Sequence, residues 1–168
     1  MHKLLLTLAT ELGSALKERN YKLAFAESCT GGMATQYITA IAGSSAWLDR
    51  SFVTYSNNAK IDMLDVSSIT LEKFGAVSEQ TAAEMAKGAL LASLANVTAS
   101  ITGVAGPDGG TADKPLGTVC FSICLREKLH TETYIQHFTG TREAIRLQSV
   151  QFILSQLLIK ITHLSQFE

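Results

Sequence analysis

Short apolar segments that end in polar or glycine-rich turns recur along this chain, and most of them lead into a segment with helical spacing. The clearest case is Lys22–Ala26, which runs into the turn Glu27–Gly32 and then into a predicted helix at Met33–Ile41. Strands that alternate with helices predict an α/β layered domain with a mostly parallel sheet. Predicted strands at Gly117–Leu125 and His130–Phe138 are joined by a short polar turn, so they are expected to pair antiparallel and make the sheet mixed.

Periodicity and capping signals predict the other elements. Apolar side chains from Leu5 to Leu16 at spacings of three and four residues indicate an amphipathic helix that Asn20 ends. Ser78 is a favourable N-cap for a helix that reaches about Ala95. The remaining predicted elements are strands at Ser51–Tyr55 and Val97–Thr102, a short helix at Asn57–Leu64, and a long closing helix from Arg142 to about Leu164 that Thr139–Thr141 caps.

Composition limits the class of protein. The 168 residues suit one domain, and no repeat or linker-like stretch divides them, so residues 1–168 are predicted to form a single domain. A net charge of −1 argues against a polybasic nucleic-acid or membrane-surface binder. No apolar run approaches the roughly 18 residues of a membrane span. Met1–Leu6 begins like a signal peptide, but charged residues soon follow, so a cytoplasmic protein is expected.

No metal or disulfide pattern is visible in the sequence. The three cysteines, Cys29, Cys120 and Cys124, cannot make a complete disulfide set and form no C-x-x-C pair. Cys120 and Cys124 lie in an apolar run and are expected to be buried. Asp108 and Asp113 are better explained by turn formation than by metal binding, so no metal is expected.

Three predicted strand ends are unusually polar or rich in glycine: Glu27–Gly32, Tyr55–Lys60 and Thr102–Gly110. Ligands of parallel α/β sheets bind beyond the carboxyl ends of the strands. These segments are therefore expected to meet at one cleft, with Arg142 at the start of the closing helix as a fourth candidate.

Ser28 lies between a predicted strand and a predicted helix. Its hydroxyl could lie near unpaired backbone N–H groups, which suit an oxyanion. On local pattern alone, capping of the next helix by Ser28 and Thr30 is the favoured alternative. Cys29 is a rival nucleophile, since a helix N-terminus lowers the pKa of a thiol.

A serine nucleophile needs a base, and the four histidines all lie outside the polar strand ends. Lys60 is another candidate base. Its ordinary pKa is about 10.4, so burial or a neighbouring positive charge would have to lower that pKa. Tyr55 could relay the proton. The alternative for Lys60 is a solvated residue on a short helix.

The loop Thr102–Gly110 has G-x-x-G-x-x-G spacing, which fits neither the dinucleotide nor the P-loop fingerprint. It could still present N–H groups to a ligand. Arg142 at a helix start suits a phosphate or carboxylate, although an ordinary surface arginine is an equal alternative.

Taken together, six segments resemble the motifs of the CinA carboxy-terminal domain family, in the same order and over nearly the whole chain. These segments are Ala26–Gly32, Gly43–Ser45, Val53–Asn57 with Lys60, Gly75–Ser78, Thr102–Gly110 and Lys114–Val119. The resemblance implies a three-layer α/β/α sandwich with a mixed, mostly parallel five-stranded sheet. It also implies hydrolysis of the carboxamide of nicotinamide mononucleotide to nicotinate mononucleotide and ammonia, in pyridine nucleotide recycling.

The resemblance further implies a cofactor-free, cytoplasmic enzyme of the Ser-Lys type that forms a homodimer and takes a small-molecule substrate, without nucleic acid or membrane. Ser28 would be the nucleophile, Lys60 the general base, and Tyr55 an aid to proton transfer. Substrate binding is expected at Thr30, Gly31, Gly32, Ser45, Thr102, Gly103, Ala105, Gly106 and Arg142.

Two alternatives remain open from the sequence. One is a catalytically silent nucleotide-binding or regulatory module connected with competence or DNA damage. The other is an amidase that acts on another small amide, because contacts with the ring and the phosphate depend on loop geometry.

Overall fold

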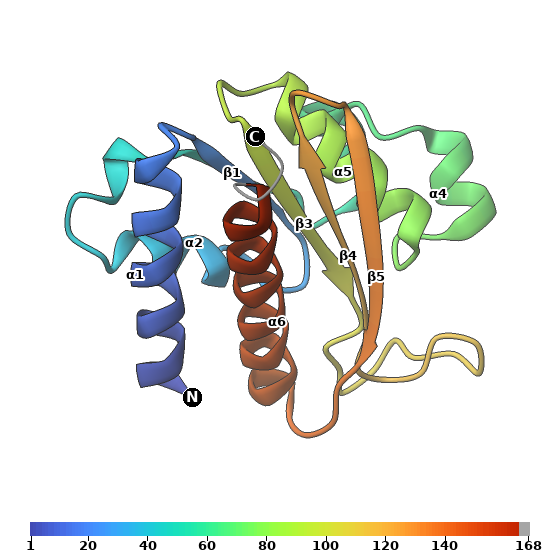
Figure 1. The fold of residues 1–168 in the computed structure, drawn as a ribbon. Helices are drawn as coiled ribbons and strands as arrows, with labels where there is room; N and C mark the ends of the chain where they lie inside the picture. Colours follow the sequence, from blue (N-terminus) through green and yellow to red (C-terminus); the bar gives the residue numbers. More distant parts are fainter. Residues whose placement is uncertain (165–168) are drawn as a thin grey trace.

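The computed structural model describes residues 1–164 as a five-stranded sheet between two layers of helices (Figure 1). The elements are α1 (His2–Glu18), β1 (Leu23–Glu27), α2 (Met33–Thr39), η1 (Ser44–Ala46), β2 (Leu48–Val53), α3 (Asn57–Leu64), α4 (Ser68–Phe74), α5 (Glu79–Leu91), β3 (Val97–Gly103), β4 (Thr118–Leu125), β5 (His130–His137) and α6 (Arg142–His163). The α/β sandwich with a mixed sheet is therefore confirmed.

The strand order is β2-β1-β3-β4-β5. Strand β1 pairs in parallel with β2 and with β3, whereas the β3–β4 and β4–β5 pairs are antiparallel. The predicted hairpin of β4 and β5 is thus present. Glu27, the last residue of β1, pairs with Val53 of β2 and with Ile101 of β3. Three strands therefore end at one edge of the sheet, nearly level with one another.

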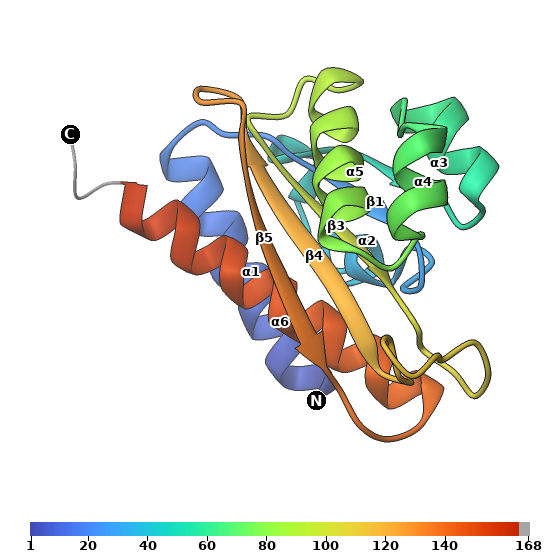
Figure 2. The same ribbon diagram turned by 90° about the vertical axis from the view of Figure 1, so that its right-hand side faces the viewer.

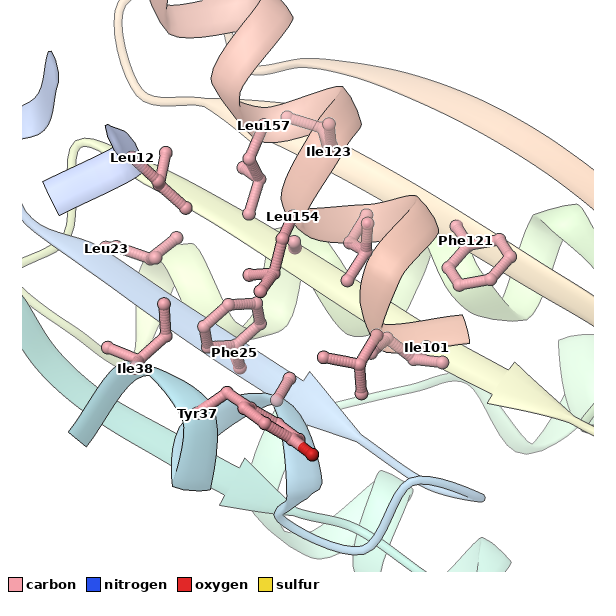
Figure 3. Packing of buried hydrophobic residues seen from close by; sticks show 14 of the residues in the cluster. Leu12, Leu23, Phe25, Tyr37, Ile38, Ile101, Phe121, Ile123, Leu154 and Leu157 are labelled. Atoms are coloured by element: carbon pink, nitrogen blue, oxygen red, sulfur yellow. The ribbon is translucent and has the colours of Figure 1, made fainter. Parts of the chain in front are cut away.

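The two faces of the sheet bury different side chains. Helices α1, α2 and α6 cover one face and α3, α4 and α5 the other (Figure 2). Phe25 and Ile101 point toward the α6 side of the sheet, in the same hydrophobic cluster as Leu154 and Leu12 (Figure 3). This alternation follows from the two-residue period of a strand.

On the α5 side, β3 presents hydroxyl groups instead of apolar groups. Thr98 Oγ1 donates to Ala86 O at 2.7 Å, and Ser100 Oγ donates to Ala82 O at 2.6 Å. Both hydroxyls are fully buried, so these bonds remove the cost of burying them without a partner. The polar residues of β3 are therefore part of the helix–sheet contact.

Several boundaries differ from the expected ones. Strand β2 begins three residues before the predicted Ser51 and ends at Val53, because Tyr55 leaves the sheet and is 63% exposed. Helix α5 ends at Leu91 instead of about Ala95, where Arg126 donates to the carbonyls of Leu90 and Ser93.

Helix α4 was absent from the sequence prediction. Ser67 caps it by accepting from Thr70 N, and Glu84 of α5 accepts from Ser67 N at 2.7 Å, which ties the start of α4 to α5. Within residues 1–164, no helix combines the length and apolar character that crossing a membrane requires.

Gly88→Ala tests the close approach of α5 to α3. Alanine normally stabilises a helix relative to glycine. Here the added Cβ would overlap Leu64 O and lie 2.9 Å from the carbonyl carbon of Leu64. We expect the free energy of unfolding to fall by about 1–3 kcal/mol in urea denaturation. The exposed neighbour Lys87→Ala is the control and should change it by less than about 0.5 kcal/mol. A stabilised Gly88→Ala protein would contradict this packing.

Candidate active site

A pocket of about 320 Å³ opens at the edge where β1, β2 and β3 end. This volume falls in the range of small-molecule sites, roughly 300–1,000 Å³. The lining residues come from all three predicted strand-end segments, from the turn before α5 and from the start of α6: Ser28, Cys29, Tyr55, Asn57, Lys60, Ala76, Val77, Thr102, Gly103, Val104, Ala105, Gly106, Asp108, Gly109 and Arg142. The predicted convergence of these segments is thus present in the structure.

Ser28 directly follows β1 and is 8% exposed. Its backbone N–H donates to Ile101 O at 2.9 Å, which continues the β1–β3 ladder by one residue. The side-chain Oγ lies 3.0 Å from Lys60 Nζ. The sheet therefore fixes the backbone of Ser28, and the lysine lies within hydrogen-bond distance of its hydroxyl.

Lys60 lies on α3 and is 1% exposed. Besides Ser28 Oγ, its Nζ donates to the carbonyl oxygens of Thr54 at 2.9 Å and Tyr55 at 3.3 Å. Among the described residues it forms no ion pair. Burial lowers the pKa of Lys60 below its ordinary value of 10.5, because a charged ammonium loses hydration there. The expectation of a solvated lysine is wrong.

Local sequence explains how Lys60 reaches this position. Ser56 caps α3, and its side chain accepts from Ala59 N at 3.0 Å. The helix thus begins directly after the strand end, and Lys60 in its first turn faces back toward Thr54 and Tyr55.

The N-terminus of α2 is occupied by the carboxylate of Glu27, a fully buried residue. One oxygen accepts from the N–H groups of Gly32 at 3.0 Å and Ala34 at 3.1 Å. The other accepts from Thr35 N at 3.0 Å and Thr35 Oγ1 at 2.7 Å. The expectation that Ser28 and Thr30 cap this helix is wrong. Glu27 takes the N–H groups that would otherwise be free.

Tyr55 and Arg142 meet at the mouth of the pocket. The Tyr55 hydroxyl accepts from Arg142 Nη2 at 3.1 Å, and Arg142 Nη1 donates to Gly106 O at 2.6 Å. Within the described residues, the Tyr55 hydroxyl has no hydrogen bond to Ser28 or Lys60. Tyr55 contacts the lysine through its backbone carbonyl instead.

The segment that follows β3 forms another wall. Thr102 Oγ1 donates to Ala76 O at 2.7 Å, which ties this wall to the turn before α5. Gly103 has no room for a side chain, because a Cβ there would lie 2.7 Å from Val119 and 2.8 Å from Thr118 O. Within residues 1–164, the N–H groups of Ala105 and Gly106 have no hydrogen-bond acceptor.

Four of the expected binding residues do not line this pocket. Thr30 is fully buried, and its Oγ1 has no hydrogen-bond partner in the described part of the chain. Gly31 and Gly32 have φ values of 57° and 95°, so they shape the turn into α2. Ser45 is exposed in η1, which precedes β2 and thus lies at the opposite edge of the sheet from Ser28.

The three thiols are buried and free. Burial raises the pKa of Cys29 to about 12, and this effect outweighs the nearby positive charge of Arg146. The expected lowering of the Cys29 pKa by a helix N-terminus is therefore wrong, since Glu27 occupies that terminus. Cys120 and Cys124 are buried in β4 as predicted, and burial raises the pKa of each thiol.

Sequence reasoning gave no role to two residues that shape the site. Glu27 lies in the segment Ala26–Gly32. A carboxylate that follows an apolar strand and precedes a glycine turn is the signal that could have indicated a helix cap. Arg146 donates to the carbonyls of Cys29 and Thr30, and its spacing of four residues from Arg142 places both on one side of α6. In the described residues, no group of three or more histidine, cysteine, aspartate or glutamate side chains could hold a metal ion.

Comparison with known proteins gives consistent matches. The CinA C-terminal domain family matches residues 5–161. "Nicotinamide-nucleotide amidohydrolase PncC" of Enterobacter agglomerans is 53% identical, over 90% of this chain and 92% of that protein. The protein of the same name from Escherichia coli (strain K12) is 48% identical, over 91% of this chain and 92% of that protein. The crystal structure of competence/damage inducible protein CihA from Agrobacterium tumefaciens superposes with a TM-score of 0.90 at 42% identity, covering 95% of this chain and 96% of that one.

Glu27→Gln tests the capping of α2. The amide keeps one acceptor oxygen but places an NH₂ group against N–H donors that the carboxylate now accepts. We expect the free energy of unfolding to fall by about 1–3 kcal/mol, because buried donors are left unsatisfied. Glu143→Gln, an exposed acidic residue in the first turn of α6, is the control and should have little effect. Equal stability of the two variants in urea denaturation would contradict the capping role.

Proposed function

Given that this chain belongs to the CinA C-terminal domain family, we propose that it hydrolyses the carboxamide of nicotinamide mononucleotide to nicotinate mononucleotide and ammonia. Support comes from two relatives that are named nicotinamide-nucleotide amidohydrolases and align over about nine-tenths of the chain. In this proposal the reaction returns the pyridine ring to nucleotide recycling.

The observation that carries the proposal is the 3.0 Å contact between Lys60 Nζ and Ser28 Oγ. A buried lysine without a carboxylate partner is costly to keep charged. Its neutral form has a lone pair that can accept the hydroxyl proton of Ser28. This arrangement supports a Ser-Lys mechanism in which Ser28 is the nucleophile and Lys60 the general base.

The reaction proceeds in two halves. Lys60 takes the proton of Ser28 as Oγ attacks the carboxamide carbon, and a tetrahedral oxyanion forms. The C–N bond then breaks, and the leaving nitrogen takes the proton from Lys60 to leave as ammonia. In the second half, Lys60 takes a proton from water as that water attacks the acyl-enzyme. The proton returns to Ser28 Oγ when the carboxylic acid product leaves.

The substrate's own charge assists this chemistry. A cationic pyridinium ring withdraws electrons from the carboxamide and makes its carbon more electrophilic. The same positive charge beside Lys60 favours the neutral form of the lysine. Burial and substrate binding therefore both lower the pKa of Lys60.

The far wall of the pocket suits the phosphate. Arg142 supplies a guanidinium, and Ala105 and Gly106 supply N–H groups without acceptors among the described residues. Thr102 and Gly103 would line the space between phosphate and amide. Tyr55 would act by holding Lys60 through its carbonyl and Arg142 through its hydroxyl.

Other parts of the proposal concern the whole molecule. We propose that residues 1–168 form one domain that works as a cytoplasmic homodimer and needs neither a cofactor nor nucleic acid. Thr30, Gly31 and Gly32 would contribute by forming the turn after Ser28. Ser45 lies outside the pocket of its own chain, so its expected binding role gains no support from this pocket.

Ser28→Ala should lower ammonia release from nicotinamide mononucleotide by at least about a thousandfold, because the nucleophile is lost. The assay includes a chelator, so retained wild-type activity would indicate a metal-free reaction. Ser14→Ala, on the exposed side of α1, is the matched control and should retain full activity. A folded wild-type protein that releases no ammonia would overturn the proposed function, whereas an active Ser28→Ala would overturn the mechanism alone.

The pH dependence of kcat/KM tests Lys60 as the base. Because burial lowers its pKa, activity should rise with pH through a midpoint below 10.5 as the neutral amine forms. Stability should change in the same direction, since the unfolded chain binds more protons than the native one between the lowered pKa and 10.5. Lys60→Met should be nearly inactive and should lack this rise in stability. A wild-type kcat/KM that does not rise with pH below 10.5 would contradict the assignment of Lys60 as the base.

A further inference from the structure

A second arginine of α6 contacts the turn that carries Ser28. Arg146 Nε donates to Cys29 O at 3.2 Å, and its Nη2 donates to Thr30 O at 2.8 Å. We propose that Arg146 is a positioning residue that fixes this turn, so that the N–H groups of Cys29 and Thr30 stabilise the oxyanion of the reaction. This inference rests on the proposed amidase function.

The peptide units of the turn are fixed from two sides. Ser28 O accepts from Gly31 N at 3.0 Å, which closes the turn. The peptide bond between Cys29 and Thr30 is trans, so its N–H points opposite to the carbonyl that Arg146 holds. Within residues 1–164, the N–H group of Thr30 has no hydrogen-bond acceptor, whereas the N–H group of Cys29 interacts with its own thiol and with no oxygen atom. The guanidinium thus orients the N–H group of Thr30, which has no acceptor in the described part of the chain.

The N–H groups at the start of α2 are already occupied. The carboxylate of Glu27 takes the N–H groups of Gly32, Ala34 and Thr35, which would otherwise be the helix N-terminus available to an anion. An oxyanion on the carbon attached to Ser28 Oγ must therefore find donors elsewhere. The N–H groups that directly follow the nucleophile are the nearest along the chain, and such donors are effective only when held in place before the reaction.

The positive charge of Arg146 also favours negative charge in the turn that carries Ser28. Guanidinium stays protonated in proteins, and among the described residues Arg146 has no ion-pair partner. Although burial dominates the pKa of Cys29 and raises it, Arg146 opposes that rise. A positive charge that favours a thiolate in this turn would also favour a developing oxyanion beside it.

Arg142 and Arg146 therefore have separable roles. Arg142 contacts the wall of the pocket at Gly106 and Tyr55, where substrate would bind. The side-chain hydrogen bonds of Arg146 within residues 1–164 go to backbone carbonyls beyond the nucleophile. Loss of Arg142 should raise KM, whereas loss of Arg146 should lower kcat.

The test compares Arg146→Gln, Arg146→Lys and Arg126→Gln in the full chain. Arg126 is a matched control, since its guanidinium also donates to backbone carbonyls, those of Leu90, Ser93 and Ala95, away from the pocket. We expect Arg146→Gln to lower kcat by about 10- to 100-fold with KM changed less than about twofold. Arg146→Lys, which keeps the charge and can reach one carbonyl, should fall between this variant and the wild type. Arg126→Gln should retain kcat.

Amide hydrogen exchange gives a second measurement that needs no substrate. Arg146→Gln should speed exchange in residues 28–35, and Arg126→Gln should not. The inference is overturned if kcat of Arg146→Gln is unchanged, if KM changes instead, or if Arg126→Gln loses as much kcat. Should the wild type release no ammonia, the proposed function fails by itself. In that case faster local exchange still supports the anchoring by Arg146, and unchanged exchange refutes it.

Discussion

The buried carboxylate of Glu27 is the interaction on which the site depends. It ends β1 and accepts four hydrogen bonds from the start of α2, so it joins strand and helix across the turn that carries Ser28. The positive end of the helix dipole compensates its charge, and among residues 1–164 this carboxylate forms no ion pair. The same interaction removes α2 as an anion site and leaves the cationic groups of α6 to act on the pocket.

The site also depends on one helix that comes late in the chain. Helix α6 packs on α1 over one face of the sheet, and its first two turns place Arg142 and Arg146 against two different walls of the pocket. Arg146 thus holds a turn at Cys29 that lies 117 positions before it in the sequence. Lys60 comes from the opposite layer, so the reactive pair is assembled between the two helical layers.

The sequence predicted the sheet and the meeting of three strand ends because strand alternation and parallel pairing are local or topological properties. It could not show that Lys60 is buried, since that burial depends on where α3 packs. Helix α4 was missed although Ser67 caps it locally by accepting from Thr70 N; Glu84, seventeen residues later, adds a tertiary hydrogen bond from Ser67 N. The direction of the Cys29 pKa was wrong because burial of the thiol, which depends on tertiary packing, raises that pKa. Tertiary packing therefore decided both the burial of Lys60 and the pKa of Cys29.

The hydroxyl groups along β3 have a consequence for the precision of the pocket. Three hydroxyl groups of β3 donate to backbone carbonyls: Thr98 to Ala86, Ser100 to Ala82 and Thr102 to Ala76. These bonds fix the position of α5, and of the turn before it, along the direction of the strand. Apolar contacts alone would let a helix slide by fractions of a turn at little cost. Directional bonds at three points allow one register, and any other breaks all three. The position of the pocket wall at Ala76 and Val77 is therefore fixed by the sheet.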